Sequence, residues 1–188
     1  MAEGVNDPER KKLYSQLIKN TLNLNDRTKV LLLDTISFKL YYTSRIQQNT
    51  EQNRTYEEIQ NILESFKDDF AVASLMGLEQ LEPILEKRED ANKELFYKVW
   101  LNIRLSNEEV EAIESILASN LVSPIDKNLL ISALTMSLME CFDEEKLKIL
   151  LNGYTHSNIE VNQRALVGIA IIFQLYSERL TLYPEIVH

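Results

Sequence analysis

Apolar residues recur along this chain mostly at spacings of three and four positions, which is the period of an α-helix with one buried face. The Asp7-Pro8 pair combines a capping carboxylate with a proline suited to a first helical turn, and the period after it predicts an amphipathic surface helix to about Leu24. Asn25-Asp26 is predicted to begin a second helix, which is apolar on more than one face through Ile46 and therefore central. No segment predicts a strand.

The longest polar interruption runs from Gln47 to Arg54 and contains no apolar side chain, which predicts a loop near 47–54. Helical spacing resumes at Thr55 and continues into a stretch with Gly77 and Pro83, where we expect a break or kink. The remaining helices are predicted near 91–104, 107–119, 124–142, 144–153 and 158–177.

The scarcity of turn-forming residues supports an all-helical chain. Four glycines and four prolines occur in 188 residues, whereas average usage predicts more than about twenty, and the tight hairpins of a barrel or sandwich depend on them. Because 45% of the residues are hydrophobic, the chain is too apolar to be disordered. We therefore expect a single all-α domain over 1–188 with about nine antiparallel helices.

Three segments share the pattern Ser/Thr-x-x-Glu followed by Ile or Val, with starts at 55, 106 and 157, which are 51 residues apart. In such a capping box the hydroxyl accepts from the amide three residues on, while the glutamate reaches back to the amide of the cap. The pattern fits either three ordinary helix caps or a repeat of helix pairs, and both readings stay open. The segments are Thr55–Ile59, Ser106–Val110 and Ser157–Val161.

The segment Asn158–Ala170 resembles the helix-opening part of a HEAT-type repeat. HEAT repeats favour an Asp in the turn and an Arg directly after the valine, where this sequence has Asn158 and Asn162. The wider stretch Leu129–Ile186 resembles an interior piece of long, uncharacterised bacterial proteins built from helical repeats. That resemblance implies a HEAT-like α-solenoid, a chain that is a fragment of a longer protein, and no particular enzyme activity. The segments that carry the wider likeness are Leu138–Asp143, Arg164–Gly168 and, at the first helix, Asp7–Tyr14.

The helix predicted at Glu160–Tyr176 has apolar side chains around nearly its whole circumference, so it must pack from several sides. Repeat arrays normally end in a unit with a polar outer face, but an apolar tail from Leu180 to Val187 follows here. Either that tail folds back over the helix, or a continuation of the chain or a second copy covers it. We expect partners to bind through this C-terminal helix.

Acidic side chains outnumber basic ones by 29 to 20, which gives a net charge of -9 and a pI near 4.8. Such a field repels phosphate backbones and anionic lipids, so the sequence predicts neither nucleic acid nor membrane as a partner. The longest apolar run, Ala165–Leu175, is too short to span a bilayer. Cys141 is the single cysteine, and the beginning of the chain has no secretion signal, so we expect a reducing, cytoplasmic location.

The sequence offers one pair that could form a nucleophile and base, Cys141 and His156. Free cysteines are mostly small buried hydrophobic residues, and His156 sits in a polar turn where a solvated or capping role is expected. With His188 as the only other histidine, no zinc cluster can be assembled. The glycines stand alone, so no loop can cradle a phosphate. We predict no catalytic, cofactor-binding or metal-binding residue.

Acidic pairs were weighed as metal ligands as well. Asp68-Asp69 begins a metal-diphosphate pattern but has no third acid at helical spacing. Glu108-Glu109 and Asp143–Glu145 lie at predicted helix starts, where the helix dipole stabilises negative charge. We therefore expect these acids to have structural roles.

Aromatic residues gather on two predicted helices, with Phe96, Tyr97 and Trp100 on one and Tyr41-Tyr42 on the other. Aromatic side chains at helical spacing pack in a core or anchor a partner, and the sequence does not separate these roles. The whole pattern favours a scaffold or protein-binding module without catalysis. The alternative is an all-α enzyme or small-ligand-binding protein with a pocket lined by carboxylates and tyrosines.

Overall fold

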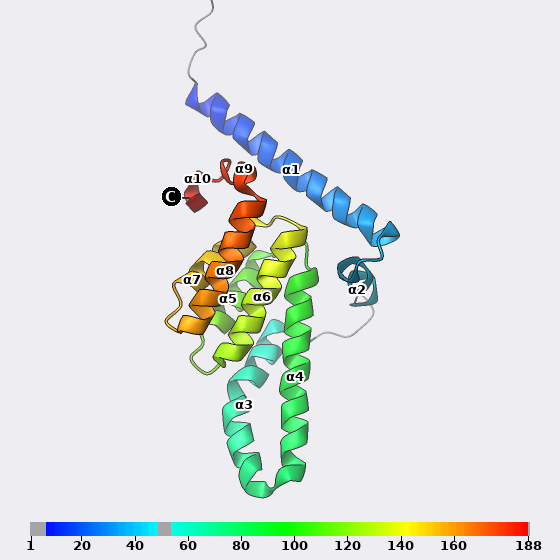
Figure 1. The fold of residues 1–188 in the computed structure, drawn as a ribbon, viewed down its shortest axis with the longest axis vertical. Coiled ribbons are helices and arrows are strands. Elements are labelled where there is room, and N and C mark those ends of the chain that lie inside the picture. Colours follow the sequence, from blue (N-terminus) through cyan, green and yellow to red (C-terminus); the bar gives the residue numbers. More distant parts are fainter. Residues whose placement is uncertain (1–6, 49–53, 188) are drawn as a thin grey trace, which may run out of the picture.

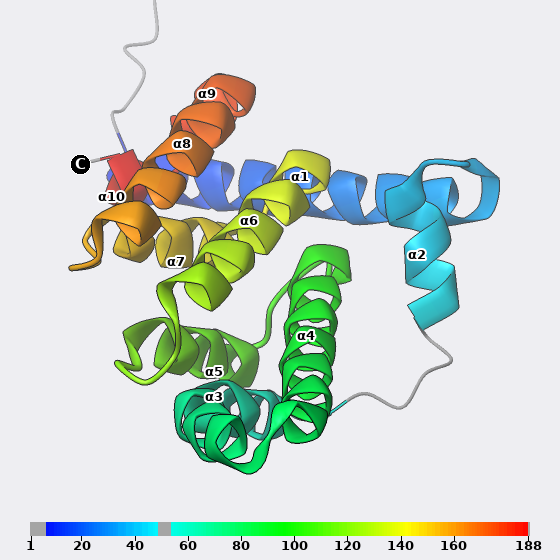
Figure 2. The ribbon, with the colours of Figure 1, turned by 60° about the horizontal axis from the view of Figure 1, so that its bottom comes forward.

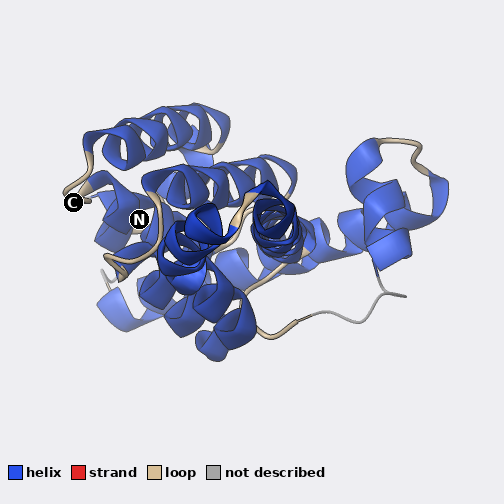
Figure 3. Cartoon of the chain, turned by 90° about the horizontal axis from the view of Figure 1, so that it is seen from below, coloured by secondary structure: helices blue, strands red, loops and turns tan. Residues whose placement is uncertain are grey.

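The computed structural model of this chain describes residues 7–48 and 54–187, and every regular element within them is an α-helix (Figure 3). The all-α prediction is thereby confirmed. None of these helices is both long and apolar enough to cross a lipid bilayer. The described residues form ten helices, the last two of them single turns: α1 (Pro8–Ile36), α2 (Leu40–Gln48), α3 (Tyr56–Met76), α4 (Leu78–Leu101), α5 (Asn107–Ala118), α6 (Pro124–Glu140), α7 (Glu144–Tyr154), α8 (Ile159–Leu175), α9 (Ser177–Leu180) and α10 (Pro184–Val187).

The first helix is longer than predicted, because α1 runs through Asn25-Asp26 without interruption. The Asp26 carboxylate accepts from Arg179 and is therefore engaged outside its own helix. The chain leaves the helix at Ser37, whose backbone is extended, and α2 begins three residues later. The prediction that the helix after Asn25 is central is also wrong, because Val30 is the one fully buried side chain of α1 while Leu31 and Ile36 are exposed.

The predicted loop near 47–54 falls mostly outside the described residues. Gln47 and Gln48 are the last residues of α2, positions 49–53 are not described, and Arg54 precedes the next helix without being helical. The Arg54 guanidinium pairs with Glu94 of α4 at 3.0 Å, which fastens the entry of α3 to its neighbour.

The break expected near Gly77 is confirmed, and it separates α3 from α4 (Figure 1). Gly77 adopts φ 124° and ψ 164°, a conformation that is essentially restricted to glycine. The two helices then lie side by side as a long hairpin that projects from the rest of the molecule. Pro83 does not end a helix, because it lies inside α4. This helix runs from Leu78 to Leu101, whereas the sequence predicted a helix that begins near residue 91.

Helix starts were predicted with most success. Asp7, Thr55, Ser106 and Ser123 all accept backbone hydrogen bonds from the first turn that follows them, and two of the three predicted capping boxes form. The third does not, because Asn158 instead of Ser157 caps α8 with its side chain. The ends of α5 to α8 lie within two residues of their predicted positions.

The core lies where α4, α6, α7 and α8 pack together (Figure 1). Buried isoleucine and leucine side chains of α6 and α7 fill its centre, among them Ile131, Leu134 and Leu150. Asp126 in the first turn of α6 is buried, and it accepts from Arg88 at 2.8 Å and Asn92 at 2.7 Å of α4. This polar clamp fixes the start of α6 against α4.

The C-terminal tail folds back onto the body, which is one of the two outcomes the sequence allowed. Leu180 and Tyr183 are buried, and the Tyr183 ring lies 5.1 Å from that of Phe142. The tail covers the end of α8 beside α1 and leaves the length of α8 open (Figure 1).

Candidate interaction surface

The outer face of α8 is apolar and uncovered. Leu166, Val167, Ile171 and Leu175 recur at spacings of one, four and four residues on this face, and Val167 and Leu175 are 59% and 52% exposed. The opposite face buries Val161, Ala165, Gly168 and Ile172 in the core. Side chains that would suit a core therefore lie on both sides of α8, as the sequence indicated, but only one side is packed.

The adjoining helix α6 continues this apolar surface. Its side chains are exposed only at positions 125, 129, 136 and 139, and Leu129, Met136 and Met139 are the large apolar members of this set in the central and final turns. Because α6 and α8 lie side by side (Figure 1), their outer faces adjoin. We refer to Leu129, Met136, Met139, Leu166, Val167, Ile171 and Leu175 as the α6–α8 surface.

The α6–α8 surface is also free of charge. No Asp, Glu, Lys or Arg occurs from Asn128 to Met139 or from Ala165 to Ser177, although 26% of the whole chain is charged. Monomeric proteins rarely leave contiguous apolar patches of this kind uncovered unless they bind something. A partner of high charge would have to lose its hydration there without gaining an ion pair.

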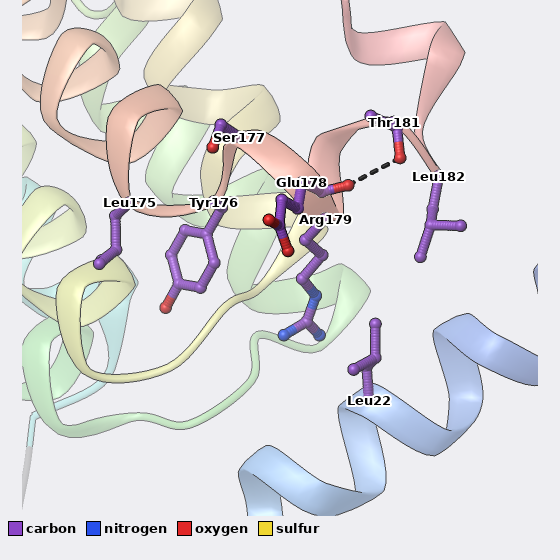
Figure 4. A pocket seen from close by; sticks show the side chains of 8 residues that line it. All are labelled: Leu22, Leu175, Tyr176, Ser177, Glu178, Arg179, Thr181 and Leu182. Carbon is purple, nitrogen blue, oxygen red and sulfur yellow. Dashed lines mark hydrogen bonds between the residues drawn. The ribbon is translucent and has the colours of Figure 1, made fainter.

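A groove of about 530 Å³ adjoins the end of this surface, between α1 and the C-terminal turns (Figure 4). Leu175 belongs to its wall, and Leu22 and Leu182 supply further apolar lining. Arg179 crosses the groove toward α1, where its guanidinium donates to Asn23 at 2.8 Å and to Asp26. The same guanidinium stacks 4.3 Å from the Phe142 ring, so this arginine serves as a structural link between the two walls.

The alternative function was a pocket lined by carboxylates and tyrosines, and this groove has one of each, Glu178 and Tyr176. Glu178 lines it, but the Tyr176 hydroxyl donates to the backbone oxygen of Leu138 at 2.8 Å. His156 lines a separate cavity of about 360 Å³ with Glu114 and Asn152. His156 therefore lies apart from Glu178 and Tyr176.

Cys141 and His156, the pair weighed as a nucleophile and base, are likewise apart. Cys141 ends α6 with its side chain buried, and burial raises the pKa of its thiol. His156 accepts from the amide of Asn158 at 3.0 Å through Nδ1. Its Nε2, which then carries the hydrogen of the neutral ring, lies 3.1 Å from the amine of Lys127.

Lys127 is a buried lysine that sequence reasoning missed. Burial and the nearby Lys67 lower the pKa of its amine. Its amine lies 3.1 Å from Nε2 of His156. The contact joins the first turn of α6 to the turn after α7, and no sequence signal distinguishes Lys127 from an exposed lysine.

A second buried lysine, Lys146 of α7, lies at the centre of a polar network. Its amine donates to the Ser137 hydroxyl at 2.8 Å and to the backbone oxygen of Asn102. Burial lowers the pKa of Lys146 to about 8, against the opposing effect of Asp143. Asp143 caps α7 and accepts from the amide of Leu105 at 3.0 Å, while burial raises its pKa. This network holds the turn between α4 and α5 in place.

Four of the other acidic candidates have structural partners. Asp69 accepts from Ser65 at 2.8 Å, Glu109 completes a capping box with Ser106, and Glu144 and Glu145 pair with Lys148. Within the described residues, no three His, Cys, Asp or Glu side chains are placed to hold a metal ion.

The aromatic side chains of the two clusters noted in the sequence divide between core and half-buried positions. Tyr41, Tyr42 and Trp100 are buried in one cluster, with ring centroids 5.0 and 5.7 Å apart, which settles their role as core residues. Burial and the neighbouring Glu140 raise the pKa of Tyr42 to about 12. Phe96 and Tyr97 are partly buried beside Trp100, so these rings do not form an open aromatic surface.

Comparison with known proteins identifies no relative. No family model matches the chain, and no curated protein or solved structure shows significant similarity to it.

Proposed function

We propose that this chain is a protein-binding module built as a segment of a HEAT-like helical array, and that the α6–α8 surface receives the apolar face of a helix from a protein partner. The observation that carries this proposal is the uncharged, apolar outer face of α8, in which Val167 and Leu175 are more than half exposed. Helices dock on such surfaces through apolar residues spaced three and four positions apart.

The packing of α6, α7 and α8 supports the array. These three successive helices pack against one another, and each is joined to the next by a short turn. In arrays of this kind each unit buries its apolar face against the next one, and the uncovered apolar face of α8 is suited to receive a partner in the same way. The module acts by shape, in a reducing, cytoplasmic setting that suits its single cysteine.

Capture of partners from a lysate of the organism that supplies the gene tests this proposal. The immobilised chain is compared with Val167→Glu, which places a charge in the surface, and with Leu75→Glu as a matched control. Leu75 lies on α3, is 89% exposed and is outside the surface. We expect one set of proteins to bind the unmodified chain and Leu75→Glu but not Val167→Glu.

Two results contradict the proposal. One is a set of partners that Val167→Glu retains, and the other is a lysate from which the unmodified chain captures nothing. In the second case, stabilisation of the chain against heat by small molecules tests the alternative of a ligand-binding protein. Circular dichroism of each variant verifies that the helices are intact, and both altered side chains are exposed, so folding is expected to persist.

A further inference from the structure

Helix α1 lies along one side of the other helices (Figure 2). Its charged residues Lys19, Asp26 and Asp34 pair with them beside the buried Val30, whereas most of its leucines are exposed, which departs from the usual arrangement of a surface helix. The inward face is fastened by ion pairs. Lys19 pairs with Glu185 at 3.1 Å, Asp26 pairs with Arg179, and Asp34 pairs with Arg45 at 3.0 Å. All three inward residues of α1 are at least partly buried by these contacts.

The outward face of α1 carries leucine at intervals of seven residues. Leu17, Leu24 and Leu31 are 60%, 66% and 52% exposed. A second exposed series has the same interval and consists of Tyr14, Thr21, Thr28 and Thr35. The first three of these residues each lie three positions before one of the leucines. In the heptad notation of coiled coils, the threonines and Tyr14 occupy position a and the leucines occupy position d.

Hydrogen bonds of the threonine hydroxyls make this face less polar than its composition suggests. Thr21 donates to the backbone oxygen of Leu17 at 2.8 Å, Thr28 to that of Leu24 at 2.9 Å, and Thr35 to that of Leu32 at 2.6 Å. Each hydroxyl hydrogen is therefore satisfied within its own helix, and the methyl group remains to pack against a partner. We refer to the exposed face from Leu13 to Thr35 as the α1 seam.

The flanks of the α1 seam are almost uncharged. Leu13, Asn20 and Arg27 follow one edge of the face, and Ile18, Asn25 and Leu32 follow the other. In two parallel helices each residue of the first edge faces the residue five positions later on the second helix. This arrangement sets Leu13 against Ile18, Asn20 against Asn25 and Arg27 against Leu32, with no like charges opposed. The antiparallel arrangement that overlaps the whole seam instead sets Arg27 against itself.

We propose that the α1 seam pairs in parallel with the α1 seam of a second copy of this chain, as a two-stranded coiled coil. Threonine has the β-branched shape of the isoleucine and valine that, at a with leucine at d, favour two parallel strands. The seam spans about three heptads, near the shortest length at which a heptad pattern indicates a coiled coil. Two chains with a net charge of -9 repel each other overall, and a seam whose opposed side chains carry no like charges is one part of their surface where this repulsion is small. The side chains of the seam are exposed in the single chain, so the body leaves them free to pair.

Sedimentation equilibrium of the full chain at about 50 μM measures this pairing directly. We expect twice the chain mass of 21.8 kDa. Leu24→Glu places a charge at a central d position and is expected to weaken the dimer by roughly tenfold or more. The control Leu75→Glu alters a more exposed leucine outside the seam and is expected to leave the dimer unchanged.

Thr28→Ile tests the proposal through a gain in dimer affinity instead of a loss. It keeps a branched side chain at a and replaces the hydroxyl with further apolar surface, so we expect the dimer to tighten by roughly tenfold. Leu17→Cys then reports orientation, because oxidation links the two copies only if residue 17 lies beside its own equivalent. In the antiparallel pair, Thr35 of the second copy lies there, and the two cysteines are roughly 27 Å apart. The unmodified chain controls for Cys141, which is buried.

Four results overturn the proposal: a monomer at 50 μM, a dimer that Leu24→Glu does not weaken, a dimer that Thr28→Ile does not tighten, and a dimer in which Leu17→Cys forms no link. A dimer that is lost in Val167→Glu but kept in Leu24→Glu would assign self-association to the α6–α8 surface instead. Because the two surfaces lie on different helices, this proposal and the proposed function can fail separately.

Discussion

Gly168 of α8 lies so close to Thr135 of α6 that a Cβ atom at position 168 would overlap the threonine hydroxyl oxygen. The same Cβ would also lie 3.3 Å from both methyl groups of Leu150. Since Thr135 donates to the backbone oxygen of Ile131 at 2.9 Å, its hydroxyl has a fixed place. Glycine at 168 therefore sets how closely the two helices of the α6–α8 surface approach.

We expect Gly168→Ala to lower the free energy of unfolding by about 1–3 kcal/mol, although alanine normally favours a helix over glycine by about 1 kcal/mol. Adding Thr135→Ala removes the overlapping oxygen and is expected to restore most of the loss. Urea unfolding of both single variants and the double variant measures the coupling. Additive effects of the two substitutions would contradict the close contact.

The clamp at Asp126 predicts a large loss of stability when its carboxylate is removed. Asp126→Ala removes the acceptor for Arg88 and Asn92 and leaves a partly buried guanidinium without its carboxylate, so we expect a loss of about 3 kcal/mol in the free energy of unfolding. Lys148→Ala, which breaks exposed pairs with Glu144 and Glu145, is the control and is expected to cost about 0.5 kcal/mol or less. Equal losses in the two variants would show that Asp126 is no clamp.

The buried Lys146 predicts a specific pH dependence. Its pKa is lowered to about 8 in the folded chain from 10.5, so above pH 8 the unfolded chain binds more protons and stability rises with pH. Lys146→Met lacks this group. The free energy of unfolding of the unmodified chain, minus that of Lys146→Met, is therefore expected to increase by about 1 kcal/mol between pH 7.5 and 9.

Taking this difference cancels the opposite contributions of Tyr41 and Tyr176, whose raised pKa values lower stability at alkaline pH. A flat difference between pH 7.5 and 9 would show that the amine keeps its ordinary pKa.

Arg179 predicts a change confined to one part of the fold. Arg179→Ala removes the contacts with Asn23 and Asp26, so the amides of α1 near these residues are expected to exchange hydrogen roughly tenfold faster or more. Amides at the centre of α6 are expected to keep their protection. Arg164→Ala, an exposed arginine of α8, serves as the control. Acceleration spread evenly over all helices would contradict a local role.

The sequence predicted helix type and most helix starts, because caps such as Ser106 act through atoms only three residues away. It misplaced the end of α1, because Asn25-Asp26 has the composition of a cap and only the distant Arg179 shows that Asp26 is engaged elsewhere. The burial of Lys127 and Lys146 could not be predicted from the sequence either, since a lysine in a helix is normally exposed and its burial depends on partners supplied by other elements.

The candidate surface was predicted in part. The apolar circumference of the C-terminal helix indicated that something must cover it, and the exposed Val167 and Leu175 lie on that helix. The apolar seam of α1 was read as part of an ordinary surface helix, because periodicity shows that a helix has two faces but not which of them is turned inward.

The contact of α1 with the tail has a consequence for how the molecule opens. Lys19 lies 3.9 Å above the Tyr183 ring and pairs with Glu185, a residue 166 positions away. The chain is thereby closed into a non-covalent ring, and detachment of either segment breaks contacts of the other. We therefore expect release of the tail to make opening of α1 more frequent, so that local unfolding of the two segments is coupled.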